Sequence, residues 1–90
     1  MMYSNRIDVI NFINNIYPII HHNSYVTENF FVHVQNNPTE LIRYKALANK
    51  YGTYSLNTSI GYLIRNLYAL PNSGRRKATR TTLIKSFESH

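Results

Sequence analysis

The stretch that most constrains the fold of this chain lies between residues 57 and 69. Its apolar residues recur at the i, i+3, i+4, i+7 and i+8 positions that form one face of an α-helix. They are Ile60, Leu63, Ile64, Leu67 and Tyr68. Ser55 or Asn57 can cap the start of this helix, and Pro71 prevents it from continuing. We therefore expect a helix over 57–69 with one buried face.

A second helical pattern precedes it and is predicted to span residues 38–51. Asn37 can cap its start, Pro38 suits its first position, and Glu40 can complete a capping box. The expected buried side of this helix consists of Leu41, Tyr44, Leu47 or Ala48, and Tyr51. Gly52 is expected to end the helix in a left-handed conformation. Residues 53–56 are then predicted to be a short connector.

The N-terminal third is less regular. Residues 5–18 are predicted to form a helix that Pro18 ends, and the wide apolar stripe of residues 7–20 offers a surface for a dimer. The segment 25–37 allows either a short strand or a helix. We favour a helix over about 28–36, because Thr27 and Glu28 make a good start and Asn36 a good stop.

Beyond the strongest helix the periodicity fades. Residues 71–74 read Pro-Asn-Ser-Gly, a turn signal, and the residues after Lys77 are rich in Thr. We expect a β-hairpin over about 70–87, and the alternative is a short final helix that buries Leu83, Ile84 and Phe87. The sequence as a whole predicts a single domain over residues 1–90, mainly α, with three to four helices.

The composition limits the class of protein. Ninety residues, 43% of them hydrophobic, are enough for one small domain with a modest core. The chain has no cysteine, which excludes disulfides and thiolate metal sites and is compatible with a reducing cytosol. Asp8, Asn11 and Asn14 interrupt the first apolar pattern, which argues against a signal peptide or a membrane span. We expect a cytoplasmic protein, intracellular and associated with the nucleoid.

The charge is positive and unevenly distributed. The chain carries ten Lys and Arg against four Asp and Glu, a formal charge of +6. Half of the basic residues lie within eleven positions, and they are Arg75, Arg76, Lys77, Arg80 and Lys85. A localised basic patch favours a polyanionic partner, because neutralised phosphates release counterions.

Three stretches in this order resemble winged-helix DNA-binding domains. ALANKYG, with Ala48 four residues before Gly52, resembles the first helix and turn of a helix-turn-helix motif. SIGYLIRNL resembles a recognition helix, and SGRRKATR resembles a wing. The resemblance covers about residues 38–87. One departure is the connector GTYSLNT, which is about two residues longer than in the compact motif.

This resemblance implies a winged-helix-like domain with a C-terminal β-hairpin wing that binds double-stranded DNA. Helix 57–69 would enter the major groove, where Arg can pair with guanine and Asn with adenine. The DNA-binding residues expected on this helix are Thr58, Ser59, Tyr62, Arg65 and Asn66. The basic segment would hold the DNA backbone with Arg75, Arg76, Lys77 and Arg80. We expect a small transcriptional or replication regulator that binds specific sequences as a homodimer.

Other functions are less well supported by the sequence. No two acids are paired at helical spacing, and no nucleophile motif or phosphate-binding loop occurs, so we expect no enzyme and no cofactor. His21, His22, His33 and His90 lack the spacing of a metal site, so no metal is expected. One alternative is a protein–protein module or small inhibitor that binds an acidic partner or the nucleic-acid channel of another protein. Another is an RNA-binding protein that uses the basic segment.

Overall fold

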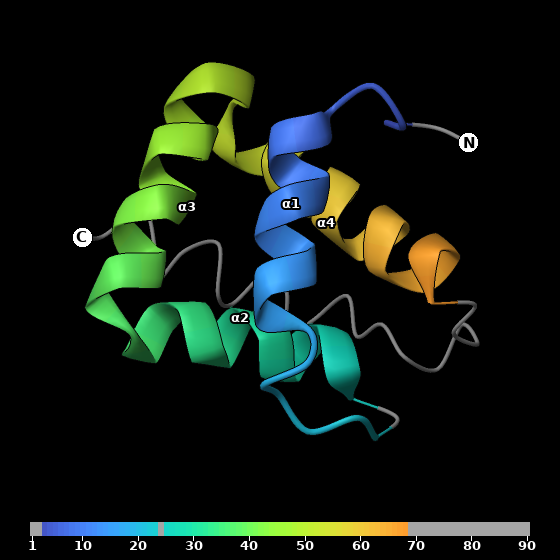
Figure 1. Cartoon of the computed structure of the whole chain (residues 1–90). Helices are drawn as coiled ribbons and strands as arrows, with labels where there is room; N and C mark the ends of the chain where they lie inside the picture. The colour runs from blue at the N-terminus through green and yellow to red at the C-terminus, as the bar shows by residue number, and fades with distance from the viewer. Residues whose placement is uncertain (1–2, 24, 69–90) are drawn as a thin grey trace.

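The computed structural model describes residues 3–23 and 25–68, and this part of the chain folds into four α-helices (Figure 1). They are α1 (Ile7–Ile16), α2 (Val26–Asn36), α3 (Pro38–Tyr51) and α4 (Thr53–Leu67). A single residue joins α2 to α3, and another joins α3 to α4, so the chain changes direction sharply at Asn37 and Gly52. No helix of the described ranges is long and apolar enough to cross a membrane.

Helix α4 is the centre of the domain. In Figure 1 it passes behind α1, while α3 stands beside α1 and α2 crosses beneath them. Its Leu56, Ile60, Leu63 and Ile64 are fully buried. The apolar stripe read from the sequence therefore lies inside the protein, and it continues one turn further toward the N-terminus than expected. Burial of each such side chain contributes roughly 1.5–3 kcal/mol before the entropy cost of ordering it.

Helix α1 uses its apolar stripe in the same core. Val9, Ile13 and Ile16 are fully buried, and Phe12 packs edge-to-face on Phe30 of α2 with ring centroids 5.7 Å apart. The stripe predicted as a dimer surface is thus covered by the other three helices. Ile7 and Ile19, near the two ends of this stripe, remain 58% and 68% exposed and do not form a continuous apolar face.

The C-terminal ends of α1 and α4 are held together by stacked rings. The Tyr17 ring lies 3.5 Å from the Tyr68 ring and 4.1 Å from the His22 ring, measured between centroids. Both neighbours lie nearly parallel to Tyr17, so they occupy its two opposite faces. The Tyr68 hydroxyl also donates a hydrogen bond to Asn14 of α1. Burial, together with the nearby Tyr17, raises the pKa of Tyr68.

The junction at Asn37 differs from the expected capping box. Asn37 occupies the N-cap position of α3 and Pro38 its first turn, but no side chain caps the helix. The side-chain amide of Asn37 instead donates a hydrogen bond to the backbone carbonyl of His33, 2.8 Å away. It thereby satisfies one of the free carbonyl groups at the C-terminal end of α2. One carboxylate oxygen of Glu40 is buried and has no hydrogen-bond partner among the described residues. A single-residue link makes Asn37 serve two helices, and its side chain can satisfy only one of them.

The winged-helix prediction for the fold is wrong in the described part of the chain. That part is all helical and contains no strand, and the expected wing at 70–87 lies outside the described residues. The predicted connector at 53–56 is also wrong, because α4 begins at Thr53 directly after Gly52. Gly52 has φ 89° and ψ 142°, a backbone conformation that glycine adopts more readily than other residues. This conformation allows α4 to begin directly after the end of α3. A helix-turn-helix connector of several residues is therefore absent at this position.

Candidate functional site

The outer face of α4 was the predicted contact surface, and its residues differ widely in accessibility. Thr58, Tyr62 and Arg65 are half-buried and Asn66 is exposed. Ser59 is fully buried, and its hydroxyl donates to the Leu56 carbonyl at 2.8 Å. Ser59 therefore cannot reach a ligand while α4 stays packed.

The N-terminal segment covers one edge of this face. The Tyr3 ring packs edge-to-face on Tyr62, with centroids 5.7 Å apart. The Arg6 guanidinium donates to the Ser55 hydroxyl at 3.1 Å and lies over the rings of Tyr3 and Tyr51, at 4.8 and 4.2 Å from their centroids. These contacts leave a narrow strip of α4 open to solvent, instead of a full helix face.

The accessible strip of α4 carries Tyr54, Thr58 and Arg65. Tyr54 is 76% exposed, and Arg65 forms no ion pair with any described residue. Asn66 lies at the other edge and donates to the carbonyl of Tyr62 at 2.7 Å. The four basic residues predicted to hold the DNA backbone, Arg75, Arg76, Lys77 and Arg80, lie outside the described residues.

Helix α3 is far more accessible than α4. Tyr44 is its only fully buried residue, and its apolar side rests on the core through half-buried side chains. Its outer face carries Ile42, Lys45 and Asn49 at i, i+3 and i+7. Ile42 is 70% exposed, and the Lys45 and Asn49 side chains bond to no described residue. We call Ile42, Lys45 and Asn49 the α3 stripe.

The carboxylate that α1 presents to α3 is already paired with partners on α3. The Asp8 carboxylate accepts hydrogen bonds from Lys50 at 2.7 Å, from the Tyr51 hydroxyl at 2.9 Å and from the Val9 amide at 2.9 Å. Partial burial acts to raise the pKa of Asp8, but these hydrogen bonds and the Lys50 charge outweigh it and hold the pKa below its ordinary value of 3.8. The hydrogen bond to Asp8, followed by the interaction with Tyr51, raises the pKa of Lys50. Arg43 and Lys45 form no ion pair within the described ranges, so the side of α3 that carries them is positively charged, although Glu40 lies in the first turn of the same helix.

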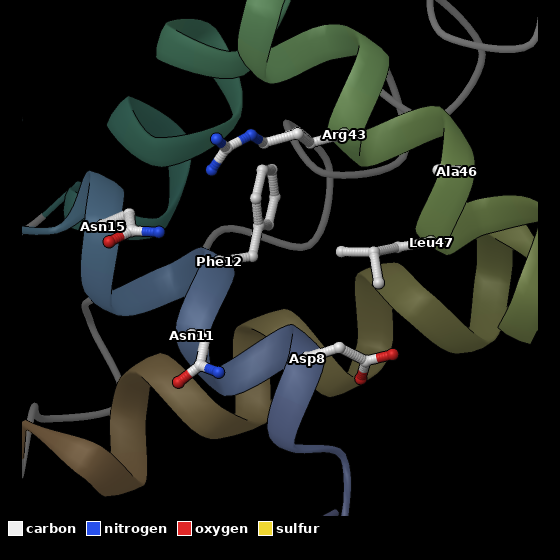
Figure 2. Close-up of a pocket in the computed structure, with 7 residues that line it drawn as sticks. All are labelled: Asp8, Asn11, Phe12, Asn15, Arg43, Ala46 and Leu47. Atoms are coloured by element: carbon white, nitrogen blue, oxygen red, sulfur yellow. The ribbon is translucent and has the colours of Figure 1, made fainter.

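A groove separates α1 from α3 (Figure 2). It has a volume of about 370 Å³ and is lined by Asp8, Asn11, Phe12, Asn15, Arg43, Ala46 and Leu47. Figure 2 shows the Arg43 side chain reaching past the Phe12 ring toward Asn15, and Leu47 pointing toward α1. The groove therefore combines an apolar floor with a cation and two carboxamides at its rim.

The described residues contain no cluster of three or more His, Asp or Glu side chains that could hold a metal ion. His22 stacks on Tyr17, and the His33 carbonyl accepts from Asn37. These two histidines have neighbours that account for their positions.

The sequence interpretation missed the α3 stripe and the groove. The α3 stripe and the groove exist only because the outer face of α3 is free. The short apolar pattern of α3 is only a weak indication of that free face. The strongest apolar pattern belongs to α4, and that same strength places α4 at the centre of the core. No protein-family model, curated protein or solved structure matches the chain.

Proposed function

We propose that this protein binds double-stranded DNA, and that α3 is the helix that enters the major groove. The observation that carries the proposal is the contrast between the two helices. The outer face of α3 is open and positively charged, whereas α4 is mostly buried and partly covered by Tyr3 and Arg6. A helix can lie in the major groove only if its outer face is free along several turns.

The chemistry of the α3 stripe suits base edges. An Asn carboxamide can pair with adenine, a Lys can donate to guanine or to a phosphate, and an apolar side chain can contact the thymine methyl group. Asn49, Lys45 and Ile42 supply one of each on a single helix face. Ile42, at 70% exposure, would lose its contact with water on binding.

The basic segment adds to this proposal through its charge alone. Half of the Lys and Arg residues lie within 75–85, a segment outside the described residues. Contacts from such residues to phosphates fix the position of a protein on DNA without reading sequence. A small chain that occupies one DNA site in this way would act as a regulator of transcription or replication.

The proposal is tested by measuring binding to a fluorescent duplex, selected from a random library, at two salt concentrations. We expect affinity to fall steeply between about 50 and 200 mM salt, as phosphate contacts require. Lys45→Gln should weaken binding, and, if Lys45 contacts a phosphate, should reduce the salt slope by about 1. No binding to any duplex at the lower salt concentration would overturn the proposal.

A matched control is available on another element. Arg65→Gln also removes one positive charge, on α4, without touching the α3 stripe. It lowers the net charge by the same amount as Lys45→Gln, so it should weaken binding less than Lys45→Gln does. Competition with an RNA duplex and with an unstructured RNA separates a DNA-binding protein from an RNA-binding one, because A-form RNA has a major groove too narrow for a helix. Preference for RNA would contradict the proposal.

A further inference from the structure

The groove between α1 and α3 holds polar groups that the fold does not use. Arg43 is exposed on α3, and Asn11 and Asn15 are exposed one turn apart on α1. None of these three side chains forms a hydrogen bond or an ion pair with a described residue. By contrast, the Asp8 carboxylate at the other end of the groove is held by Lys50 and Tyr51. The groove therefore offers hydrogen-bond donors and acceptors that are not used by the described residues. The Asp8 carboxylate beside them already has its hydrogen-bond partners.

The floor of the groove is apolar. Phe12 is only 4% exposed and lies between the two helices, and Leu47 covers the α3 side. Ala46 has a small side chain, which leaves the space open. The volume of about 370 Å³ falls within the range of about 300–1,000 Å³ that is usual for small-molecule sites. One flat, partly apolar ligand with an anionic end would fit this combination of surfaces.

We propose that the groove between α1 and α3 binds an adenine nucleotide. A carboxamide presents a donor and an acceptor side by side, which matches the N6 and N7 atoms of adenine. Asn11 and Asn15 each offer such a pair at the rim. The Arg43 guanidinium can donate two parallel hydrogen bonds to a phosphate, and the apolar floor can receive the face of the base. A free nucleotide and a nucleotide within a strand present this same chemistry.

This inference does not depend on the proposed binding of duplex DNA. The α3 stripe and the groove lie on neighbouring faces of α3, with Ala46 one turn from Ile42, and they share no residue. Asn49→Ala should therefore leave nucleotide binding unchanged, and filling the groove should leave the α3 stripe intact. The two proposals can fail separately.

The test is an NMR titration of the ¹⁵N-labelled full chain with AMP, GMP, CMP, UMP and inorganic phosphate. We expect AMP to shift the side-chain amide signals of Asn11 or Asn15 and the backbone signals of Ala46 and Leu47. One bidentate pair to a base corresponds to about 5- to 150-fold discrimination, so AMP should bind more tightly than CMP or UMP by that factor. Equal affinity for all four nucleotides and for phosphate would overturn the inference.

Two variants locate the site. Ala46→Met fills the groove at an exposed helical position, where Met is well tolerated, and should abolish AMP binding while the circular dichroism spectrum stays the same. Arg43→Gln should weaken binding of AMP at least tenfold, which corresponds to a lost charge-assisted hydrogen bond, and should have little effect on adenosine. Lys45→Gln is the matched control, because it removes the same charge from the other edge of α3. Unchanged AMP binding in Ala46→Met would overturn the site.

A last arm compares AMP with an oligo(dA) of about fifteen nucleotides, long enough to pass through a groove that binds one or a few bases. Tighter binding of the oligonucleotide, lost in Ala46→Met, would identify the ligand as an adenine base within a strand. Equal or weaker binding would identify it as a free nucleotide. Binding of a short acidic peptide in preference to both would show that the groove is a protein-docking site and would overturn the inference.

Discussion

Loss of one buried hydroxyl should measurably destabilise the contact between α3 and α4. The Tyr44 hydroxyl donates a hydrogen bond of 2.6 Å to the Asn57 side-chain oxygen, and both residues are buried. The Asn57 side-chain nitrogen has no hydrogen-bond partner in the part of the chain that the structure describes. Tyr44→Phe would leave the amide oxygen without this donor as well, in a site that water does not reach.

The expected cost follows from that burial. A buried polar group left without its partner costs about 1–3 kcal/mol of stability. For a domain of this size, each kcal/mol lowers the melting temperature by about 4–8 °C. Replacing both partners by apolar groups is nearly neutral, so the double variant Tyr44→Phe/Asn57→Leu should recover most of the loss.

The assay is urea unfolding followed by circular dichroism, with wild type, both single variants and the double variant forming a cycle. Tyr54→Phe is the control, because Tyr54 is 76% exposed and its change should stay within about 0.5 kcal/mol. If Tyr44→Phe were as mild as Tyr54→Phe, the buried hydrogen bond would not be contributing and the reasoning would be refuted.

Three further predictions concern stability. Because the folded-state pKa of Asp8 is lowered, this carboxylate stabilises the fold above its ordinary pKa of 3.8, and the contribution is lost as the pH falls through the folded value. Asp8→Asn should therefore lose less stability than wild type between about pH 6 and about pH 2, and an identical acid loss would contradict this. Ile13→Ala should lower the free energy of unfolding by about 2–5 kcal/mol, because Ile13 is fully buried. Ile19→Ala should change it very little, because Ile19 is 68% exposed. Similar melting temperatures for the two variants would contradict the packing of α1. Gly52→Ala should cost about 1–3 kcal/mol, because φ is 89° although no atom lies near the added carbon, and a stabilising effect would contradict the backbone conformation.

Local signals in the sequence identified most of the helical ends. Pro38 stands in the first turn of α3, Gly52 follows its last residue, and Pro18 comes shortly after α1 ends at Ile16. These residues act through their own backbone restrictions, which do not depend on the rest of the fold. The segment 25–37, which allowed a strand or a helix, contains α2.

The start of α4 was missed although a signal was present. Leu56 lies four residues before Ile60, so the apolar stripe already extended into the segment read as a connector. Thr53 and Ser55 favour capping and turn positions, and this local preference was given more weight than the stripe. Leu56 packs in the core as part of α4, so the segment 53–56 is helical and not a connector.

The accessibility of the helices was beyond the reach of sequence patterns. A periodic stripe shows which side of a helix is apolar, but it does not show what covers the other side. Arg6 and Ser55 are 49 positions apart, and their contact closes one edge of α4. The open face of α3 likewise depends on how three other helices pack. The candidate surfaces on α3 therefore became visible only in the folded chain.

The most direct test of this account compares Asn49→Ala on α3 with Arg65→Ala on α4, on one duplex selected from a random library. Fluorescence anisotropy at a single low salt concentration gives both affinities. We predict that Asn49→Ala weakens binding by about 1–3 kcal/mol and relaxes specificity at one base pair, while Arg65→Ala changes it little. The opposite result, with Arg65 essential and Asn49 dispensable, would contradict the assignment of α3 as the helix that reads DNA.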